Sequence, residues 1–275
     1  FFDIHFDSPP SHVLNQYHDM LDAQWFTGAT LNFAEKLLSR NDQHLAIVSI
    51  DEQGYRKTYT YHELQKQVAQ CAAGLKQAGI VEGDRVAAIL PNIAEAIIAM
   101  LATASIGALW SSCSPDFGAN AVIDRLGQIE PKLLFVSNGH HYHGKIHDAL
   151  TKIEELSAKI PSLRRLVVCP HIHKKHDLTT IPKAILWDDF LKPCEDLTFT
   201  PLPFAHPLYI LFSSGTTGKP KCIIHGAGGT LLQHIKELGL HTDIKPGDNL
   251  FFYTTTGWMM WNFTLAALLT GSTIV

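Results

Sequence analysis

The loop at residues 212–222 holds side chains that could bind a charged ligand. It reads FSSGTTGKPKC and follows an apolar run at 208–211, which predicts a buried strand. Gly215 and Gly218 let the backbone approach a ligand closely, so that successive N–H groups can converge on an anion. Four hydroxyl groups and two lysines add donors and positive charge. The composition indicates either a polyphosphate site or a mobile polar loop with solvated lysines.

The spacing within this loop differs from two well-known phosphate-binding motifs. A Walker loop has four residues between its glycines and a Ser or Thr directly after its Lys. Here only two residues separate Gly215 from Gly218, and Pro220 follows Lys219. The later glycines at 226, 228 and 229 lack the register of a Rossmann fingerprint. The loop must therefore be interpreted from its position in the fold.

The surrounding sequence predicts an α/β fold that would place the loop at the edge of a sheet. Apolar strand patterns occur at 45–50, 85–90, 108–110, 132–137, 165–169, 208–212, 222–225 and 250–253. Helical patterns occur at 60–79, which opens with a capping box at Thr60 and Glu63, and at 95–105, 120–129, 147–159, 230–238 and 262–269. This alternation predicts parallel sheets covered by helices on both faces, and such sheets bind ligands beyond the carboxyl ends of their strands.

Composition limits the classes of function. The 275 residues are 46% hydrophobic and carry a net charge of −4, which argues against a general nucleic-acid binder. Five scattered cysteines without CxxC spacing predict reduced thiols in the cytoplasm. The apolar stretch 86–110 contains Pro91, Asn92 and Glu95, so we do not expect a membrane span. We expect a piece of a longer chain, because no Met opens the sequence and its last residues resemble a strand; the sequence does not predict an oligomeric state.

Two groups of histidines could suggest a metal site. One group is His140, His141, His143 and His147, and the other is His171, His173 and His176. A zinc site needs three or four converging ligands, and neither group has cysteines or carboxylates at zinc-like spacing. The sequence predicts histidines of surface loops and no metal bound by protein ligands.

Longer stretches around the loop carry a family resemblance. YILFSSGTTGKPK (209–221) resembles the phosphate-binding signature of the adenylate-forming superfamily, which includes acyl-CoA synthetases, peptide-synthetase adenylation domains and luciferases. WFTGATLNFAEKLL (25–38), GDRVAAILPN (83–92) and ASIGALWSSCSPDFG (104–118) also fit its pattern. SPDFGANAVIDRLGQIEPKLLF (114–135), PKCIIHGAGGTLLQHIKE (220–237) and TTTGWMMWN (254–262) are most similar to the acetoacetyl branch. In that branch a Cys is expected at the place of Cys222.

The resemblance implies a fold and a reaction. Residues 1–275 would form an incomplete part of the large N-terminal adenylation domain, without its remainder or the small C-terminal domain. The reaction would join acetoacetate to coenzyme A through an acyl-adenylate, with ATP and Mg²⁺. The catalytic residues are expected beyond Val275, so this chain alone is predicted to be inactive. Two alternatives stay open: a ligase for another short acid such as butyrate, and a non-catalytic nucleotide-binding or oligomerisation module.

The resemblance also implies site residues. The β- and γ-phosphates of ATP would be held by Ser213, Ser214, Gly215, Thr216, Thr217, Gly218, Lys219 and Lys221. The acyl pocket would be lined by Trp258, Met259, Met260, Trp261 and Asn262, and we hypothesise that the Asn262 amide contacts the 3-oxo group. The nucleotide of coenzyme A would contact Lys145. For Lys145, the alternative is a solvated lysine, and for the pocket residues it is ordinary core packing.

Overall fold

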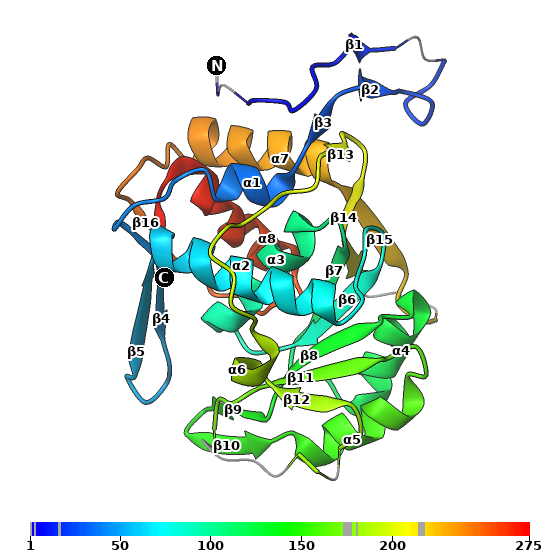
Figure 1. Ribbon diagram of the computed structural model, residues 1–275, viewed down its shortest axis with the longest axis vertical. Coiled ribbons are helices and arrows are strands. Elements are labelled where there is room, and N and C mark those ends of the chain that lie inside the picture. Colours follow the sequence, from blue (N-terminus) through cyan, green and yellow to red (C-terminus); the bar gives the residue numbers. More distant parts are fainter. Residues whose placement is uncertain (1, 3, 16–17, 173–177, 180, 214–217) are drawn as a thin grey trace.

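A computed structural model describes residues 2, 4–15, 18–172, 178–179, 181–213 and 218–275 (Figure 1). Its centre is a seven-stranded sheet in the order β12-β11-β8-β6-β7-β14-β15. These strands are β6 (Arg85–Ile89), β7 (Leu109–Cys113), β8 (Leu133–Ser137), β11 (Arg165–Cys169), β12 (Ala184–Leu186), β14 (Pro207–Phe212) and β15 (Cys222–Gly226). Neighbouring strands are parallel except β14 and β15, which form an antiparallel pair at one edge. The predicted α/β fold with a mixed sheet is confirmed.

Helices cover both faces of this sheet. The helices α2 (Tyr61–Gln77) and α3 (Ala94–Ser105) lie on one face, and α4 (Ala119–Ile129) and α5 (Leu150–Lys159) lie on the other (Figure 1). Alternate residues of β6 enter different cores, because side chains alternate along a strand. Val86 and Ala88 pack in the core under α2 and α3, whereas Ala87 and Ile89 pack under α4 and α5.

The predicted capping box begins α2. The Thr60 hydroxyl accepts a hydrogen bond from the Glu63 N–H at 3.1 Å, and the Glu63 carboxylate accepts one from the Thr60 N–H at 2.8 Å. These two bonds give partners to two backbone N–H groups at the start of the helix, where no intrahelical acceptor exists. One residue later, the Tyr61 hydroxyl donates to the Ser272 carbonyl oxygen at 2.6 Å, which fastens α2 to the last strand of the chain.

Smaller elements surround the central sheet. A second sheet has the order β16-β17-β4-β5, from β4 (Leu45–Ile50), β5 (Arg56–Thr60), β16 (Asn249–Leu250) and β17 (Thr273–Ile274). The two-stranded pairs are β1 (His12–Leu14) with β2 (Trp25–Thr27), β3 (Thr30–Leu31) with β13 (Leu202–Pro203), and β9 (Gly139–Tyr142) with β10 (Lys145–Asp148). The remaining helices are α1 (Phe33–Leu37), α6 (Trp187–Phe190), α7 (Ala227–Lys236), a π-helix (Glu237–His241), α8 (Met259–Leu265) and a 3₁₀-helix (Ala266–Thr270).

The structure corrects several predicted boundaries. The helix predicted from His147 begins at Leu150, because His147 belongs to strand β10, paired with His140 of β9. The strand predicted at 250–253 ends at Leu250, and its three aromatic residues are exposed beyond the point where β17 stops pairing. Helix α8 starts three residues before the predicted Asn262, at Met259.

The apolar stretch 86–110 runs through three elements, β6, α3 and the start of β7, which together form part of the core. Among the described residues, no helix has both the length and the apolar character needed to cross a membrane. All five cysteines are free thiols, and three of them, Cys71, Cys113 and Cys169, are buried.

Candidate functional site

The carboxyl ends of four parallel strands meet at one edge of the central sheet. The four strands stand side by side in the order β8-β6-β7-β14 and are parallel. The segments that follow them therefore all leave the sheet at the same edge. These segments are the turn after Ile89, the turn at 114–118, the β9–β10 hairpin and the loop after Phe212. The candidate loop therefore lies where open α/β sheets bind ligands, as the sequence predicts.

The base of the 213–221 loop is closed by reciprocal hydrogen bonds. The Ser213 N–H donates to the Lys221 carbonyl oxygen at 3.0 Å, and the Lys221 N–H donates to Ser213 Oγ at 3.3 Å. Because Ser213 Oγ accepts that bond, its own hydroxyl hydrogen is available to a ligand oxygen. The Gln128 amide of α4 donates to the Pro220 carbonyl oxygen at 2.9 Å and holds the returning arm of the loop. The predicted ligands Ser214, Gly215, Thr216 and Thr217 lie outside the described residues.

The two lysines of this loop have few protein partners. Lys219 Nζ lies 3.9 Å from Asp124 Oδ1 of α4, and the Lys219 side chain is 73% exposed. The exposed Lys221 ammonium has no ion pair within the part of the chain that the structure describes. Both charges are therefore available to an anion that enters between α4 and the end of β14. Gly218, also exposed, has open space where a side chain would stand.

A second loop, at 254–258, is anchored across the same edge. Ser112 Oγ of β7 donates to the Thr256 carbonyl oxygen at 2.5 Å, and Thr256 Oγ1 donates to the Leu90 carbonyl oxygen at 2.9 Å. A Cβ at Gly257 would lie 3.3 Å from the Ser114 nitrogen, so only glycine fits here without displacing backbone. This loop thus fixes the start of α8 against the ends of β6 and β7.

The predicted acyl-pocket residues divide into two groups. Trp258, Met259 and Met260 line a cavity of about 370 Å³ together with residues 252–255. Trp261 is 2% exposed and does not line that cavity: its ring stacks on Trp110 at 6.4 Å, and its Nε1 donates to Asn92 Oδ1 at 3.0 Å. The first three residues are therefore placed to touch a ligand, whereas Trp261 packs in the core.

Asn262 is also buried, at 1% exposure. Its amide nitrogen donates to the Trp258 carbonyl oxygen at 3.3 Å, and its Oδ1 has no partner within the described residues. The amide nitrogen has a second N–H that can donate, but Asn262 does not line the 370 Å³ cavity. Its hypothesised contact with the 3-oxo group therefore stays a prediction.

Lys145 lies exposed on the β9–β10 hairpin that follows β8. The tip of this hairpin is held by the Glu52 carboxylate, which accepts the N–H groups of His143 at 2.9 Å and Gly144 at 3.0 Å. These backbone bonds lower the pKa of Glu52 and so favour its charged form at neutral pH. The hairpin therefore presents Lys145 from a fixed turn on the same edge as the 213–221 loop.

The first histidine group forms this hairpin rather than the predicted surface loop. The rings of His140 and His147 stack at 5.0 Å, and His140 Nε2 lies 3.3 Å from Asp116 Oδ1. Burial lowers the pKa of His140, opposed by the charge of Asp116. No cluster of three or more metal-ligating side chains occurs among the described residues. Of the second group, His173 and His176 lie outside those residues.

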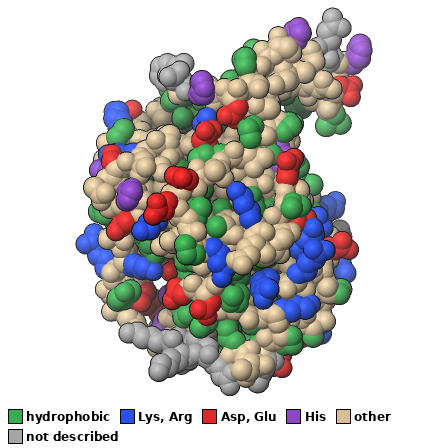
Figure 2. All heavy atoms as spheres, in the orientation of Figure 1, with side chains coloured by type: hydrophobic (Ala, Val, Ile, Leu, Met, Phe, Trp, Pro, Cys, Tyr) green, Lys and Arg blue, Asp and Glu red, His purple; other side chains and the backbone are tan. Residues whose placement is uncertain are grey.

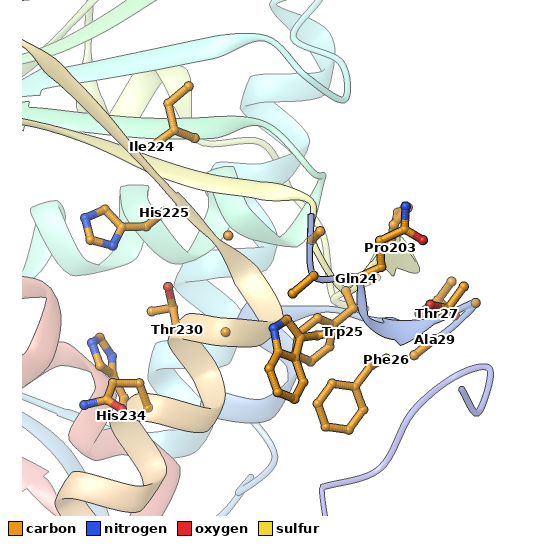
Figure 3. A pocket seen from close by; sticks show the side chains of 18 of the residues that line it. Gln24, Trp25, Phe26, Thr27, Ala29, Pro203, Ile224, His225, Thr230 and His234 are labelled. Carbon is orange, nitrogen blue, oxygen red and sulfur yellow. The ribbon is translucent and has the colours of Figure 1, made fainter. Parts of the chain in front are cut away.

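Sequence reasoning missed a larger cavity of about 920 Å³ between the N-terminal segment, β15 and α7 (Figure 3). It is lined by aromatic and aliphatic residues and by polar side chains, which are Gln24, Thr27 and Thr30 of the N-terminal segment and His225, Thr230, Gln233 and His234 of β15 and α7. Burial, with a smaller contribution from His225, lowers the pKa of His234 to about 4. The sequence did contain a signal for this site. Thr230 and His234 are four residues apart and so share one face of a helix, beside the apolar Leu231, which predicts that they lie together.

Comparisons with known proteins agree with this geometry. A family model described as AMP-binding enzyme matches residues 34–275. The chain is 46% identical over 261 residues to the acetoacetyl-CoA synthetase of Mus musculus, covering 92% of this chain and 39% of that protein. It is 46% identical over 265 residues to the malonamoyl-CoA synthetase vrtB of Penicillium aethiopicum, covering 91% of this chain and 37% of that protein.

A solved structure is also similar. The acetoacetyl-CoA synthetase from Streptomyces lividans superposes with a TM-score of 0.94 at 45% identity, over all of this chain and 42% of that one. The chain thus spans about two fifths of the length of the relatives that it matches.

Proposed function

The chain belongs to the AMP-binding enzyme family, and from this membership we propose that its full-length protein joins acetoacetate to coenzyme A with ATP. The carboxylate oxygen attacks the α-phosphorus, which forms acyl-adenylate and releases pyrophosphate. The thiol of coenzyme A then attacks the acyl carbonyl carbon, and AMP leaves. The observation that carries the proposal is the 213–221 loop, with two exposed lysines at the carboxyl end of a buried strand, in a chain 46% identical to an acetoacetyl-CoA synthetase.

The described loop residues suit the phosphate tail of ATP. The Ser213 hydroxyl is free to donate to a phosphate oxygen, while Lys219 and Lys221 offset the negative charge of the departing pyrophosphate. Ser214, Gly215, Thr216, Thr217 and Gly218 complete the proposed phosphate site. Mg²⁺, bound with the phosphates, would supply further charge neutralisation there.

The loop at 254–258 and the start of α8 would hold the acid. Trp258, Met259 and Met260 offer adaptable apolar walls beside the strand ends, and the buried Trp261 and Asn262 support them from the core. The hairpin residue Lys145 would contact the nucleotide of coenzyme A with its exposed ammonium. We include a cytoplasmic location in the proposal, supported by the five free thiols.

Two relatives narrow the class of acid. Acetoacetyl and malonamoyl groups both carry a carbonyl at carbon 3, and proteins named for each are 46% identical to this chain. We therefore propose short 3-carbonyl acids as the substrate class, with acetoacetate as its first member. Butyrate has the same carbon skeleton as acetoacetate without the 3-oxo group, and it is the informative comparator.

The test is AMP release by the full-length protein with ATP, coenzyme A and a panel of acetoacetate, malonamate and butyrate. Preference for acetoacetate supports the proposal, and preference for butyrate would assign a different short acid. If no acid released AMP while ATP still bound, the chain would instead belong to a nucleotide-binding module. The 275-residue chain alone is expected to be inactive, and turnover by it would refute that expectation.

A further inference from the structure

The 920 Å³ cavity has buried polar side chains at the end formed by α7, called here the polar end, whereas Gln24 and Thr27 at its other end are exposed or half-buried. In Figure 3, Trp25 and Phe26 lie at one end, and His225, Thr230 and His234 gather at the other. Pockets for small molecules commonly combine apolar walls with a few converging polar groups. The polar end lies between α7 and the outer strands of the sheet, so it is the part of the cavity where a ligand could be oriented.

His234 is the unusual residue at this polar end. Its side chain is 2% exposed, and neither of its ring nitrogens has a hydrogen-bond partner within the described residues. Buried polar groups are nearly always hydrogen-bonded, because leaving one unpaired loses its interaction with water without replacement. An unpaired imidazole facing a cavity therefore points to a partner that enters the cavity.

The surroundings of His234 keep it in a neutral form. The Phe263 ring of α8 packs against it edge-on, with ring centroids 5.4 Å apart. Burial lowers its pKa to about 4, so the ring is uncharged at neutral pH. A neutral imidazole has one N–H donor and one acceptor nitrogen. It can therefore bind a carbonyl oxygen without bringing a charge into the apolar pocket.

Two other polar groups nearby have partners. The Tyr209 hydroxyl of β14 donates to Met259 Sδ at 3.9 Å, and the Gln233 amide donates to Glu237 Oε1 at 3.1 Å. The Tyr209 ring lies 5.0 Å from the ring of His225. Within this cluster, His234 is the group with a spare donor that is also almost completely buried.

Met259 connects this polar end with the candidate acid site. It lines the 370 Å³ cavity at the carboxyl edge of the sheet and also the 920 Å³ cavity beside α7. An acid bound against Met259 at the strand ends would therefore border the cavity that His234 also lines. A four-carbon acid would occupy only the part of the larger cavity next to Met259.

We propose that the His234 imidazole N–H donates a hydrogen bond to the 3-carbonyl oxygen of the bound acid and so selects 3-carbonyl acids over saturated ones. This inference rests on the proposed function and assigns the selectivity of its acid site to one residue. An acid without the 3-carbonyl group would leave the donor buried and unpaired, which is the situation that gives strong discrimination. Asn262 lines neither this cavity nor the 370 Å³ cavity, so it is not placed to supply this bond.

The test compares His234→Leu with wild type in the full-length protein, by the kcat/KM for acetoacetate and for butyrate in AMP release. We expect the acetoacetate value to fall about 30- to 100-fold while the butyrate value changes less than about threefold. His234→Gln, which keeps an N–H donor, is expected to restore part of the preference. His241→Leu is the matched control, since His241 is an exposed histidine in the following helical turn, and its ratio should equal that of wild type.

The inference would be overturned if His234→Leu still used both acids with the same ratio of kcat/KM values as wild type. That result would not contradict the proposed function. If wild type used neither acid, the proposed function would fail. The inference would then be tested separately, by measuring whether each acid binds next to His234. The probe is then the ¹⁵N resonance of the His234 ring, assigned by its loss in His234→Gln. A shift with acetoacetate and none with butyrate supports the contact; no shift with acetoacetate overturns it.

Discussion

Lysine and arginine side chains at the amino ends of the central sheet differ in their contacts from the two lysines of the 213–221 loop at its carboxyl ends. At the amino ends of the strands, Arg85 donates to the carbonyl oxygens of Ile129 at 2.7 Å and Glu130 at 3.3 Å. Lys183 donates to the Leu163 carbonyl oxygen at 2.6 Å. At the carboxyl ends, the exposed Lys221 has no ion pair within the described residues, and Lys219 reaches Asp124 only at 3.9 Å.

The difference in contacts follows from which backbone groups at each end of the sheet lack hydrogen-bond partners. Helix α4 ends at the amino edge, where its last carbonyl groups lack intrahelical partners and attract cations. Arg85, Lys132, Arg164 and Lys183 line a shared cavity of about 600 Å³ there, in the region of β8, β11 and α4 where Figure 2 shows basic side chains gathered. Charge at this edge therefore stabilises the fold, whereas the loop lysines have only the 3.9 Å ion pair of Lys219 among the described residues and, in the proposed function, bind phosphate.

The largest expected effect is on the loop. Lys221→Ala should lower kcat/KM for ATP in the full-length protein by about 10²- to 10³-fold, because one preorganised charge on the phosphates is lost. The exposed Lys221 side chain has no ion pair among the described residues, so the thermal midpoint should stay within about 1 °C of wild type. Steady-state AMP release and thermal unfolding measure the two quantities. A lower thermal midpoint with unchanged kcat/KM for ATP would contradict this prediction. It would mean that Lys221 stabilises the fold, as the cations at the amino edge do.

The next effect concerns His234, whose ring nitrogens have no hydrogen-bond partner in the part of the chain that the structure describes. Its folded pKa of about 4 lies below the ordinary value of 6.5. As pH falls from about 6.5 to 4, the unfolded chain takes up a proton that the folded chain does not, so stability declines across that window and is constant above it.

For His234 this pH-dependent loss amounts to about 3 kcal/mol at most. The measurement is the difference between wild type and His234→Leu in the free energy of unfolding at pH 7 and pH 4.5. The variant should lose less stability on acidification, since it lacks the group that titrates. Equal losses in both proteins would mean that His234 is already protonated or partnered when folded.

A somewhat smaller effect is expected at the amino edge. Lys132 Nζ lies 2.5 Å from Asp84 Oδ1, and the Asp84 side chain is 8% exposed. Lys132→Met leaves that carboxylate buried without its cation and should cost about 2 kcal/mol of folding free energy. The thermal midpoint should fall by about 4–8 °C while kcat/KM for ATP stays unchanged.

The control is Lys159→Met. It breaks the 2.7 Å pair between Lys159 and Glu155, whose side chains are 50% and 43% exposed. Exposed pairs contribute little, so its midpoint should move by about 1–2 °C or less. A loss of ATP turnover in Lys132→Met at unchanged stability would contradict the division between the two ends of the sheet.

The features of the fold and the site that could be predicted from the sequence are those whose sequence pattern is local. The capping box at Thr60 and the buried strand before Ser213 are local patterns, and both are confirmed. The β9–β10 hairpin was missed because its strands are polar and pair only with each other, without the apolar alternation that predicts a strand. The burial of His234 was missed because it depends on Phe263, which is distant in sequence.

The amino-edge cluster could have been predicted. Arg85 opens β6, and Lys132, Arg164 and Lys183 each stand directly before a buried or half-buried strand. Parallel strands begin at the same edge, so four basic residues at four strand starts must lie near one another. The sequence does not reveal their partners, because the tertiary arrangement decides that Arg85 reaches the last carbonyl groups of α4 and that Lys183 reaches Leu163. That arrangement decides which cations stabilise the fold.

The smallest expected effect concerns the ion pair between Lys219 and Asp124, the only one that the loop makes within the described residues. Asp124 is 46% exposed and lies 3.9 Å from the ammonium of Lys219. Exposed pairs of this length contribute little, so Asp124→Asn should change stability by less than about 0.5 kcal/mol. Freed from Asp124, Lys219 should bind the phosphates slightly better, lowering KM for ATP by about twofold or less. The gain should vanish in about 0.5 M salt, because screening weakens exposed interactions. A midpoint several degrees lower would instead show that Lys219 holds the loop onto α4, as Arg85 holds the end of the same helix.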